Sequence, residues 1–223
     1  MDSLLNTLSK TVRSWMLIPA RGIDRLSRGR VKPDHITLVS LLGHLFVVWA
    51  LWNSRPILAA LLLIFFGLMD SLDGALARLQ RTASVRGMFY DATSDRVKEV
   101  LIYVGIALYI ETIGVYGYDV RLVDSPPPGY LYFWIPVAVL GLSLLVSYIK
   151  AKGEMALSTG GYDPQKLNRI FSAGFARYEV RMFIVVVGLL SGRIITALYV
   201  LLVLLFITCV QRFIKVSKEL SNV

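Results

Sequence analysis

Cysteine is nearly absent from this chain of 223 residues, because Cys209 is the single cysteine and lies inside an apolar run. An intrachain disulfide is therefore excluded, and the expected role of this side chain is that of a small buried hydrophobe. Histidine is also scarce. His35 and His44 each stand alone among apolar neighbours, where helix-start and packing roles are expected. Residues 1–30 lack an apolar core that ends in small residues, so no cleavable signal peptide is expected.

Long apolar runs dominate what is present. Hydrophobic residues make up 56% of the chain, and the mean hydropathy is +0.62. Soluble domains reach only about 45–50% apolar residues even when glycine is counted, and about 20 apolar residues span a bilayer as a helix. The sequence therefore predicts an all-α integral membrane protein. Six transmembrane helices are expected near residues 35–53, 57–77, 88–115, 129–149, 180–192 and 194–214.

Residues 1–30 alternate apolar and basic side chains at helical spacing, with Leu4, Leu8, Val12 and Trp15 near one face. This pattern predicts an amphipathic helix that lies in the membrane interface, and a helix packed on the rest of the protein is the alternative. The expected organisation is a juxtamembrane helix over 1–30, a six-helix transmembrane domain over 31–215 and a tail over 216–223.

Lysine and arginine are distributed unevenly between the predicted loops. Of the 24 basic residues, 21 lie in the N-terminal region, two alternate loops and the tail, and only Arg55, Arg121 and Arg193 lie in the three opposite loops. The positive-inside rule then places both termini on the cytoplasmic side of the cell membrane. Topology and anionic lipid headgroups account for the net charge of +9, so no nucleic-acid partner is expected.

Four aspartates gather between the second and third apolar runs. Asp70 and Asp73 are three residues apart, and Asp91 and Asp95 are four apart, so each pair occupies one face of a helix. A short connection suggests an antiparallel hairpin in which the two faces meet. Each carboxylate costs about 2.5–3.5 kcal/mol in mid-membrane on insertion scales. A divalent cation would relieve this repulsion, and oxygen ligands favour Mg²⁺, Mn²⁺ or Ca²⁺ over zinc.

The neighbours of these aspartates suit a phosphate-rich ligand. Gly74 permits close approach to the backbone, and Arg78 shares a helical face with Asp70 and can offer its guanidinium to phosphate. Ser84 and Gly87 lie in or beside the connection. A metal-bound pyrophosphate would have a stabilised leaving group, and one aspartate could activate a hydroxyl.

A structural role for the aspartates is the alternative. A single intramembrane aspartate often serves helix packing or an ion pathway, and Asp95 could pair with Arg96 or Lys98 at a helix end. Four aspartates at these spacings, with Gly and Arg between them, favour a ligand site instead.

The spacing D-x2-D-G-x2-A-R-x8-G-x3-D-x3-D resembles the signature of the CDP-alcohol phosphotransferases, which are membrane enzymes of phospholipid synthesis. The eight matching positions are Asp70, Asp73, Gly74, Ala77, Arg78, Gly87, Asp91 and Asp95. The resemblance implies that Asp70, Asp73 and Asp91 bind a pair of divalent metal ions, Mg²⁺ or Mn²⁺. It also implies that Asp95 is the general base and lies near a metal ion, and that the protein is a homodimer.

The resemblance further implies a site for a CDP-linked lipid. Gly74, Arg78 and Ser84 match positions that hold the CDP moiety, and "PDHIT" resembles the segment "PNxIT" of the family, with Asp34 in place of asparagine. In the implied reaction, an acceptor hydroxyl deprotonated by Asp95 attacks the β-phosphate of the CDP-lipid, and CMP leaves. The expected CDP-lipid-binding residues are Pro33, Asp34, His35, Ile36, Thr37, Asp70, Gly74, Arg78, Ser84 and Gly87.

The signature does not identify the acceptor alcohol, so other segments must indicate it. "SYIKAKGE", residues 147–154, resembles "SYxxARAE" of the branch that uses inositol phosphate, and it contributes Lys150 and Lys152. Arg177 and Arg181 share a helical face before the fifth span. Four cations suit a phosphorylated polyol, so inositol 1-phosphate is the expected acceptor and glycerol 3-phosphate the alternative. Ordinary positive-inside cations are the competing interpretation.

Two other functional classes are compatible with an acidic helical bundle. Membrane prenyltransferases bind Mg²⁺-diphosphate through two distant acidic motifs, whereas both pairs here lie within residues 70–95. A divalent-metal transporter would need polar residues across the membrane, but the last three predicted spans are nearly uncharged inside. The sequence therefore favours an enzyme.

Overall fold

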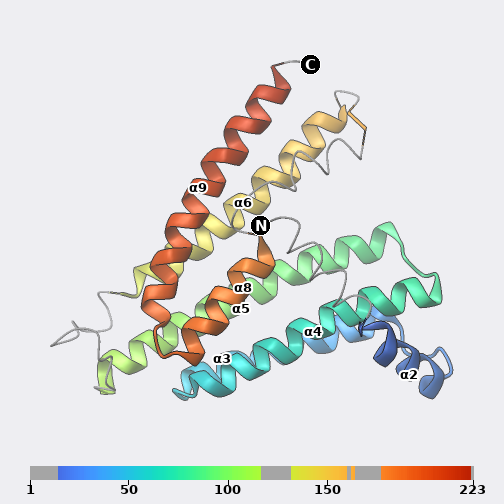
Figure 1. Cartoon of the computed structure of the whole chain (residues 1–223), viewed down its shortest axis with the longest axis horizontal. Coiled ribbons are helices and arrows are strands. Elements are labelled where there is room, and N and C mark those ends of the chain that lie inside the picture. Colours follow the sequence, from blue (N-terminus) through green and yellow to red (C-terminus); the bar gives the residue numbers. More distant parts are fainter. Residues whose placement is uncertain (1–14, 117–131, 160–161, 164–176, 222–223) are drawn as a thin grey trace.

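A computed structural model of the chain describes residues 15–116, 132–159, 162–163 and 177–221. Within these ranges every regular element is a helix and no strand is present. The predicted all-α class is confirmed, and each of the six predicted apolar runs forms a helix. The helices are α2 Leu17–Ser27, α3 Pro33–Trp52, α4 Pro56–Gln80, α5 Val85–Tyr116, α6 Trp134–Thr159, α8 Tyr178–Leu190 and α9 Ile194–Leu220 (Figure 1).

Four of these helices, α3, α4, α6 and α9, are long and apolar enough to cross a membrane. Helix α5 has 32 residues but carries charged side chains in its first half, and α8 has only 13 residues. Large apolar side chains remain exposed on the apolar helices, including Phe46 at 61%, Phe65 at 59% and Phe206 at 60%. Soluble monomers rarely expose extensive apolar surface, so these helices fit a lipid environment.

Proline and left-handed residues set the helix ends around the aspartates. Pro33 and Pro56 stand in the first turns of α3 and α4, where the missing N–H has no helical partner to lose. Arg81 ends α4 in a left-handed conformation with φ of 56°. Its amide donates to carbonyl oxygens of the last turn of α4, and α5 then begins at Val85 after a short connection.

Helix α3 packs against both α4 and α5, whereas α4 and α5 make almost no close backbone contact over the described residues (Figure 1). The prediction that α4 and α5 form a packed hairpin is therefore wrong. The two helices share the connection but keep their backbones apart, and α3 packs against both. The approach of α3 to α5 depends on Gly105, because a Cβ there would lie 2.9 Å from Cδ1 of Leu51 and 3.3 Å from Cα of Val48.

Helices α6 and α9 pack along each other, and α8 contacts both α9 and α4. Leu198, Leu201 and Leu205 of α9 are fully buried in the shared core. Cys209 is buried as predicted, and its thiol lies 3.6 Å from the carbonyl oxygen of Leu142 on α6. Helix α6 also packs against α5, and this contact joins the second group of helices to the first.

Helix α2 packs on the last turns of α4, where Ala20 is buried among Ile36, Ala75 and Leu76. The Gln80 amide donates hydrogen bonds to Oδ1 of Asp24 at 2.8 Å and to the carbonyl oxygen of Val31 at 2.9 Å. The predicted helix over residues 1–30 is thus described only from residue 15 onward, and its residues 1–14 lie outside the described part.

Candidate active site

The four aspartates lie where α4 ends and α5 begins. Asp73 is buried, with 6% of its surface exposed, whereas Asp91 is exposed. The side chains of Asp70 and Asp95 keep 17% and 26% of their surface exposed. The cluster is therefore sheltered on its α3 side and open on the other.

Helix α3 supplies two hydroxyl groups that orient the carboxylates of α4. Oγ1 of Thr37 donates to Oδ2 of Asp73 at 2.5 Å, and Oγ of Ser40 donates to Oδ1 of Asp70 at 2.8 Å. Thr37 was expected at the lipid-nucleotide site, but Ser40 was not foreseen. The signal was nevertheless present, because Thr37 and Ser40 are three residues apart and share a face of an apolar helix.

Lys98 places its ammonium group beside two of the aspartates. Its Nζ lies 2.6 Å from Oδ1 of Asp70 and 3.5 Å from Oδ1 of Asp95, and its side chain is fully buried. The sequence suggested a contact of Asp95 with Lys98, which lies three residues further along α5. The contact with Asp70, which is 28 residues away in sequence, joins α5 to α4, and α3 packs against both helices.

The donor chemistry of the cluster fits a divalent metal ion. The potential metal ligands of the cluster are carboxylate oxygens, and hydroxyl groups orient two of these carboxylates. Mg²⁺ and Mn²⁺ prefer such hard oxygen ligands. Among the described residues no three acidic, histidine or cysteine side chains already converge as a closed ligand set. Each helix carries its own pair of carboxylates, and the ammonium group of Lys98 lies between Asp70 of one and Asp95 of the other.

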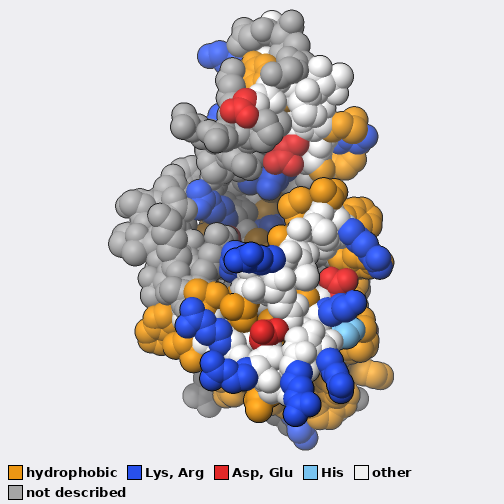
Figure 2. All heavy atoms as spheres, turned by 90° about the vertical axis from the view of Figure 1, so that its right-hand side faces the viewer, with side chains coloured by type: hydrophobic (Ala, Val, Ile, Leu, Met, Phe, Trp, Pro, Cys, Tyr) orange, Lys and Arg blue, Asp and Glu red, His pale blue; other side chains and the backbone are white. Residues whose placement is uncertain are grey.

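A cavity of about 680 Å³ opens between α3, α4 and the start of α5. Six of the eight signature positions line it, and these are Asp73, Gly74, Ala77, Arg78, Gly87 and Asp91. Lys32 and Arg78 add positive charge at its wall, and Figure 2 shows that Lys and Arg side chains surround this end of the molecule. The cavity therefore combines carboxylates, glycine backbone and cations, a set that can receive a metal-bound phosphate group.

The remaining residues expected to bind the CDP-lipid divide between the cavity wall and other places. Pro33, Asp34, Thr37 and Ser84 line the cavity, and Oγ of Ser84 accepts a hydrogen bond from the amide of Gly87 at 3.1 Å. Two of the expected residues of "PDHIT" lie elsewhere. Nδ1 of His35 accepts from the amide of Lys32 at the start of α3, and Ile36 is buried against α2 and α4. These two side chains hold the helix that carries Thr37. Gln80, which also lines the cavity, was not foreseen.

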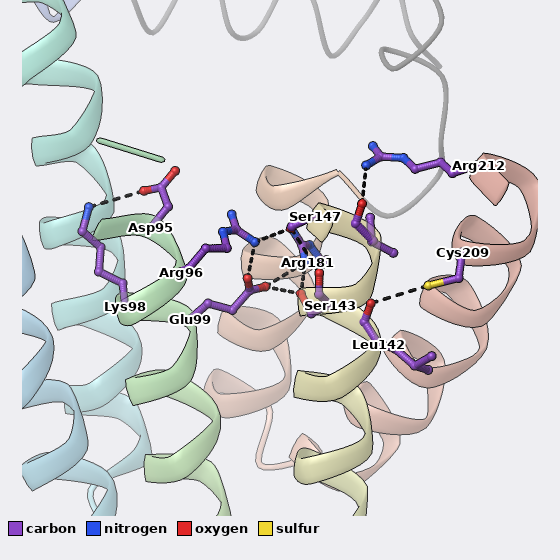
Figure 3. Close-up of polar contacts among 11 residues, drawn as sticks. Asp95, Arg96, Lys98, Glu99, Leu142, Ser143, Ser147, Arg181, Cys209 and Arg212 are labelled. Atoms are coloured by element: carbon purple, nitrogen blue, oxygen red, sulfur yellow. Dashed lines mark hydrogen bonds and ion pairs between the residues drawn. The ribbon is translucent and has the colours of Figure 1, made fainter. Parts of the chain in front are cut away.

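A second charged cluster lies on the other side of α5. Glu99 is fully buried and contacts Arg96, Arg181 and Ser143 (Figure 3). Nη1 of Arg96 also donates to Oγ of Ser147 at 2.7 Å. Glu99 was not foreseen from the sequence, although a carboxylate one helical turn beyond Asp95 in an apolar helix is a signal for a buried ion pair.

The four cations expected to bind the acceptor are not equivalent. Lys150 and Lys152 are exposed on α6, and Nζ of Lys150 lies 3.8 Å from Oε1 of Glu154. Arg177 precedes α8 directly. Arg181 is instead 3% exposed, and its Nη1 lies 2.7 Å from Oε1 of Glu99. Arg181 is thus held by Glu99 of α5, and its part in binding the acceptor stays a prediction.

The comparison with protein families decides the class. The model of the CDP-alcohol phosphatidyltransferases matches residues 30–214. The chain belongs to the CDP-alcohol phosphatidyltransferase family. The family predicted from the eight signature positions is thus confirmed, and so is the expectation of a transferase.

Similar members of the family come from archaea and bacteria. The archaetidylinositol phosphate synthase of Pyrococcus horikoshii is 27% identical over 191 residues, which cover 86% of each chain. The enzyme of the same name from Methanothermobacter thermautotrophicus is 28% identical over 99% of this chain and 97% of its own. Both alignments therefore extend over most of the two chains that they compare.

Solved structures of Mycobacterium tuberculosis phosphatidylinositol phosphate synthase have the same fold. The form in complex with manganese and citrate is 25% identical, with a TM-score of 0.70 over 90% of this chain and 88% of that chain. The form with bound CDP-DAG gives a TM-score of 0.70 at 24% identity over 90% and 92% of the chains. The likeness thus covers nearly the whole described bundle.

Proposed function

We propose that this protein transfers a phosphatidyl-type group from a CDP-linked lipid to a phosphorylated polyol and releases CMP. The observation that carries the proposal is the cavity in which six of the eight signature positions come together. Relatives named archaetidylinositol and phosphatidylinositol phosphate synthases support inositol 1-phosphate as the acceptor. Glycerol 3-phosphate has the same charge and is the acceptor to be tested beside it.

Each part of the cavity has a role in this proposal. The pyrophosphate of the donor lies beside Gly74 and Arg78, where the backbone is accessible and a guanidinium can donate paired hydrogen bonds. Asp95 accepts the proton of the acceptor hydroxyl. The oxygen then bonds to the β-phosphorus of the donor, the bond from this phosphorus to the bridging oxygen breaks, and CMP leaves.

The divalent metal of the site is Mg²⁺ or Mn²⁺ in this proposal, and two ions are expected. Asp70, Asp73 and Asp91 hold it, with Asp95 close by, and the neighbour crystallised with manganese supports this choice. When bound, the metal stabilises negative charge on the attacking and leaving oxygens. The hydroxyl groups of Thr37 and Ser40 fix the orientation of the α4 carboxylates that would hold the ion.

The acceptor phosphate is proposed to bind at the cytoplasmic ends of α6 and α8. Lys150, Lys152, Arg177 and Arg181 are the cations proposed to bind it, and the buried ion pair with Glu99 fixes the position of Arg181. A phosphorylated polyol can then approach α5, from which Asp95 takes its proton. Cationic side chains recognise phosphate through charge-assisted hydrogen bonds.

The membrane arrangement completes the proposal. All six apolar runs are proposed to span the bilayer, with residues 31–215 as the catalytic domain, 216–223 as a tail and 1–30 as an interfacial helix. Both termini and the cavity face the cytoplasm, in agreement with the positive-inside distribution of charge. A homodimer is proposed from the resemblance to the family.

The test is CMP release from CDP-diacylglycerol, or from its ether-linked archaeal counterpart, with a panel of acceptors. Inositol 1-phosphate should support turnover, and Asp95→Asn should abolish it while the protein stays folded. Asp163→Asn, which changes an exposed aspartate outside the cavity, is the matched control. Turnover with serine or free inositol alone would contradict the proposed acceptor, and normal turnover by Asp95→Asn would contradict the proposed base.

A further inference from the structure

Lys98 is the buried cation of the aspartate cluster, and the family signature does not include it. Its side chain is fully buried, and its Nζ contacts Asp70 at 2.6 Å and Asp95 at 3.5 Å. A buried ammonium group is costly unless opposite charge and hydrogen bonds compensate it. The groups that compensate Lys98 are two carboxylates of the proposed metal site.

The contacts of Asp70 show that Lys98 occupies a carboxylate oxygen that a metal ion could otherwise bind. Its Oδ1 accepts hydrogen bonds from both Oγ of Ser40 and Nζ of Lys98, at 2.8 and 2.6 Å. An oxygen with two donors at these distances has little capacity left for a metal ion. Lys98 also connects α4 to α5, whose backbones make almost no close contact. The ammonium group thus holds carboxylates of both helices near each other.

We propose that Lys98 is a built-in cation that sets the affinity of the aspartate site for divalent metal. It competes with the ion for Asp70 and Asp95, and it keeps the two carboxylates in place between metal-binding events. This inference rests on the proposed metal site. Its consequence is a weaker and more readily reversible metal site than four unpaired carboxylates would form.

Direct Mn²⁺ binding to the purified full chain in detergent tests the proposal, with titration calorimetry or the Mn²⁺ resonance signal as readout. Lys98→Met and Lys98→Gln both remove the charge, and each should lower the Kd for Mn²⁺ by at least about tenfold. Lys98→Arg keeps the charge and should stay within about threefold of the unaltered protein. Lys218→Met, at an exposed position near the end of α9, controls for the loss of one positive charge.

A second readout separates competition from a purely structural role. Without metal, Lys98→Met and Lys98→Gln should unfold at a lower temperature than the unaltered protein, because the carboxylates then lose their cation. Saturating Mn²⁺ should raise the unfolding temperature of these variants more than that of the unaltered protein. A lysine that served packing alone would leave the Mn²⁺ increment unchanged.

The outcomes distinguish this inference from the proposed metal site. If the unaltered protein binds Mn²⁺ and Asp91→Asn weakens binding, but Lys98→Met and Lys98→Gln bind with unchanged or lower affinity, the role of Lys98 is overturned. If Asp91→Asn binds Mn²⁺ as the unaltered protein does, the proposed metal site is itself overturned, and the inference falls with it. Tighter binding by both neutral variants, with Lys218→Met unchanged, supports the inference.

Discussion

Two charged clusters are centred on α5 within a helical turn of each other. Carboxylates outnumber the cation in the first cluster, and cations outnumber the carboxylate in the second. In the first, Lys98 is shared by Asp70 and Asp95, and further carboxylates lie around it. In the second, Arg96 and Arg181 share the single carboxylate of Glu99, which is fully buried (Figure 3).

The difference between the clusters indicates where a ligand can bind. The aspartate cluster has more negative charge than its own cation neutralises, and it borders a cavity, so an added cation is stabilised there. The Glu99 cluster is closed by Ser143 and Ser147 and joins α5 to α6 and α8. We therefore assign chemistry to the first cluster and bundle assembly to the second.

Removing one aspartate should have the largest effect on activity. Asp91→Asn should reduce kcat/KM for CMP release by at least about a thousandfold, or about 4 kcal/mol, because a ligand of the proposed metal site is lost. Steady-state CMP release at saturating Mn²⁺ measures this, with Asp163→Asn as control. An activity near that of the control would contradict a catalytic role for the aspartate cluster.

Removing Glu99 should act on stability. Glu99→Ala leaves the buried guanidinium of Arg181 and the partly exposed guanidinium of Arg96 without their carboxylate, and we expect a loss of about 3 kcal/mol in the free energy of unfolding. Thermal or denaturant unfolding in detergent measures the loss, and Glu179→Ala, at an exposed site in the first turn of α8, is the control. Equal stability of the two variants would contradict the structural role of the second cluster.

A smaller effect is expected from a hydroxyl group that orients a carboxylate. Thr37→Val removes the hydrogen bond to Asp73 at nearly constant volume, and kcat/KM should fall about tenfold. The apparent Mn²⁺ affinity should fall with it. Thr112→Val on α5, whose hydroxyl donates to the carbonyl oxygen of Leu108 within its own helix turn, should leave both quantities unchanged. Equal behaviour of the two variants would show that α3 does not tune the site.

The smallest effect is expected at the proposed acceptor site. Lys150 is exposed and pairs loosely with Glu154, so Lys150→Ala should raise the KM for inositol 1-phosphate about threefold to tenfold with kcat nearly unchanged. Lys218→Ala provides the control. If KM for the acceptor does not move, the phosphate is held elsewhere than at the end of α6.

Some contacts of the site follow from the spacing of residues along the chain, and others do not. The spacing of Asp70, Asp73, Asp91 and Asp95 predicted two carboxylate faces, and six signature positions do line one cavity. The predicted contact of the two helices was wrong, because helical period describes the faces of α4 and α5 but not the angle between them. The ion pair of Arg181 with Glu99 was not foreseen for a related reason, since the two residues are 82 positions apart in sequence.

The sequence by itself determined the helical membrane class, the family and the identity of the chemical groups, because these depend on composition, local periodicity and fixed spacing along the chain. Only the tertiary structure decided which charged groups meet. Helix α3 packs against both α4 and α5, closely so at Gly105, and this packing leaves a cavity at the start of α3 and sets Lys98 beside Asp70. Contacts between residues distant in sequence depend on how the helices pack, which no local pattern encodes.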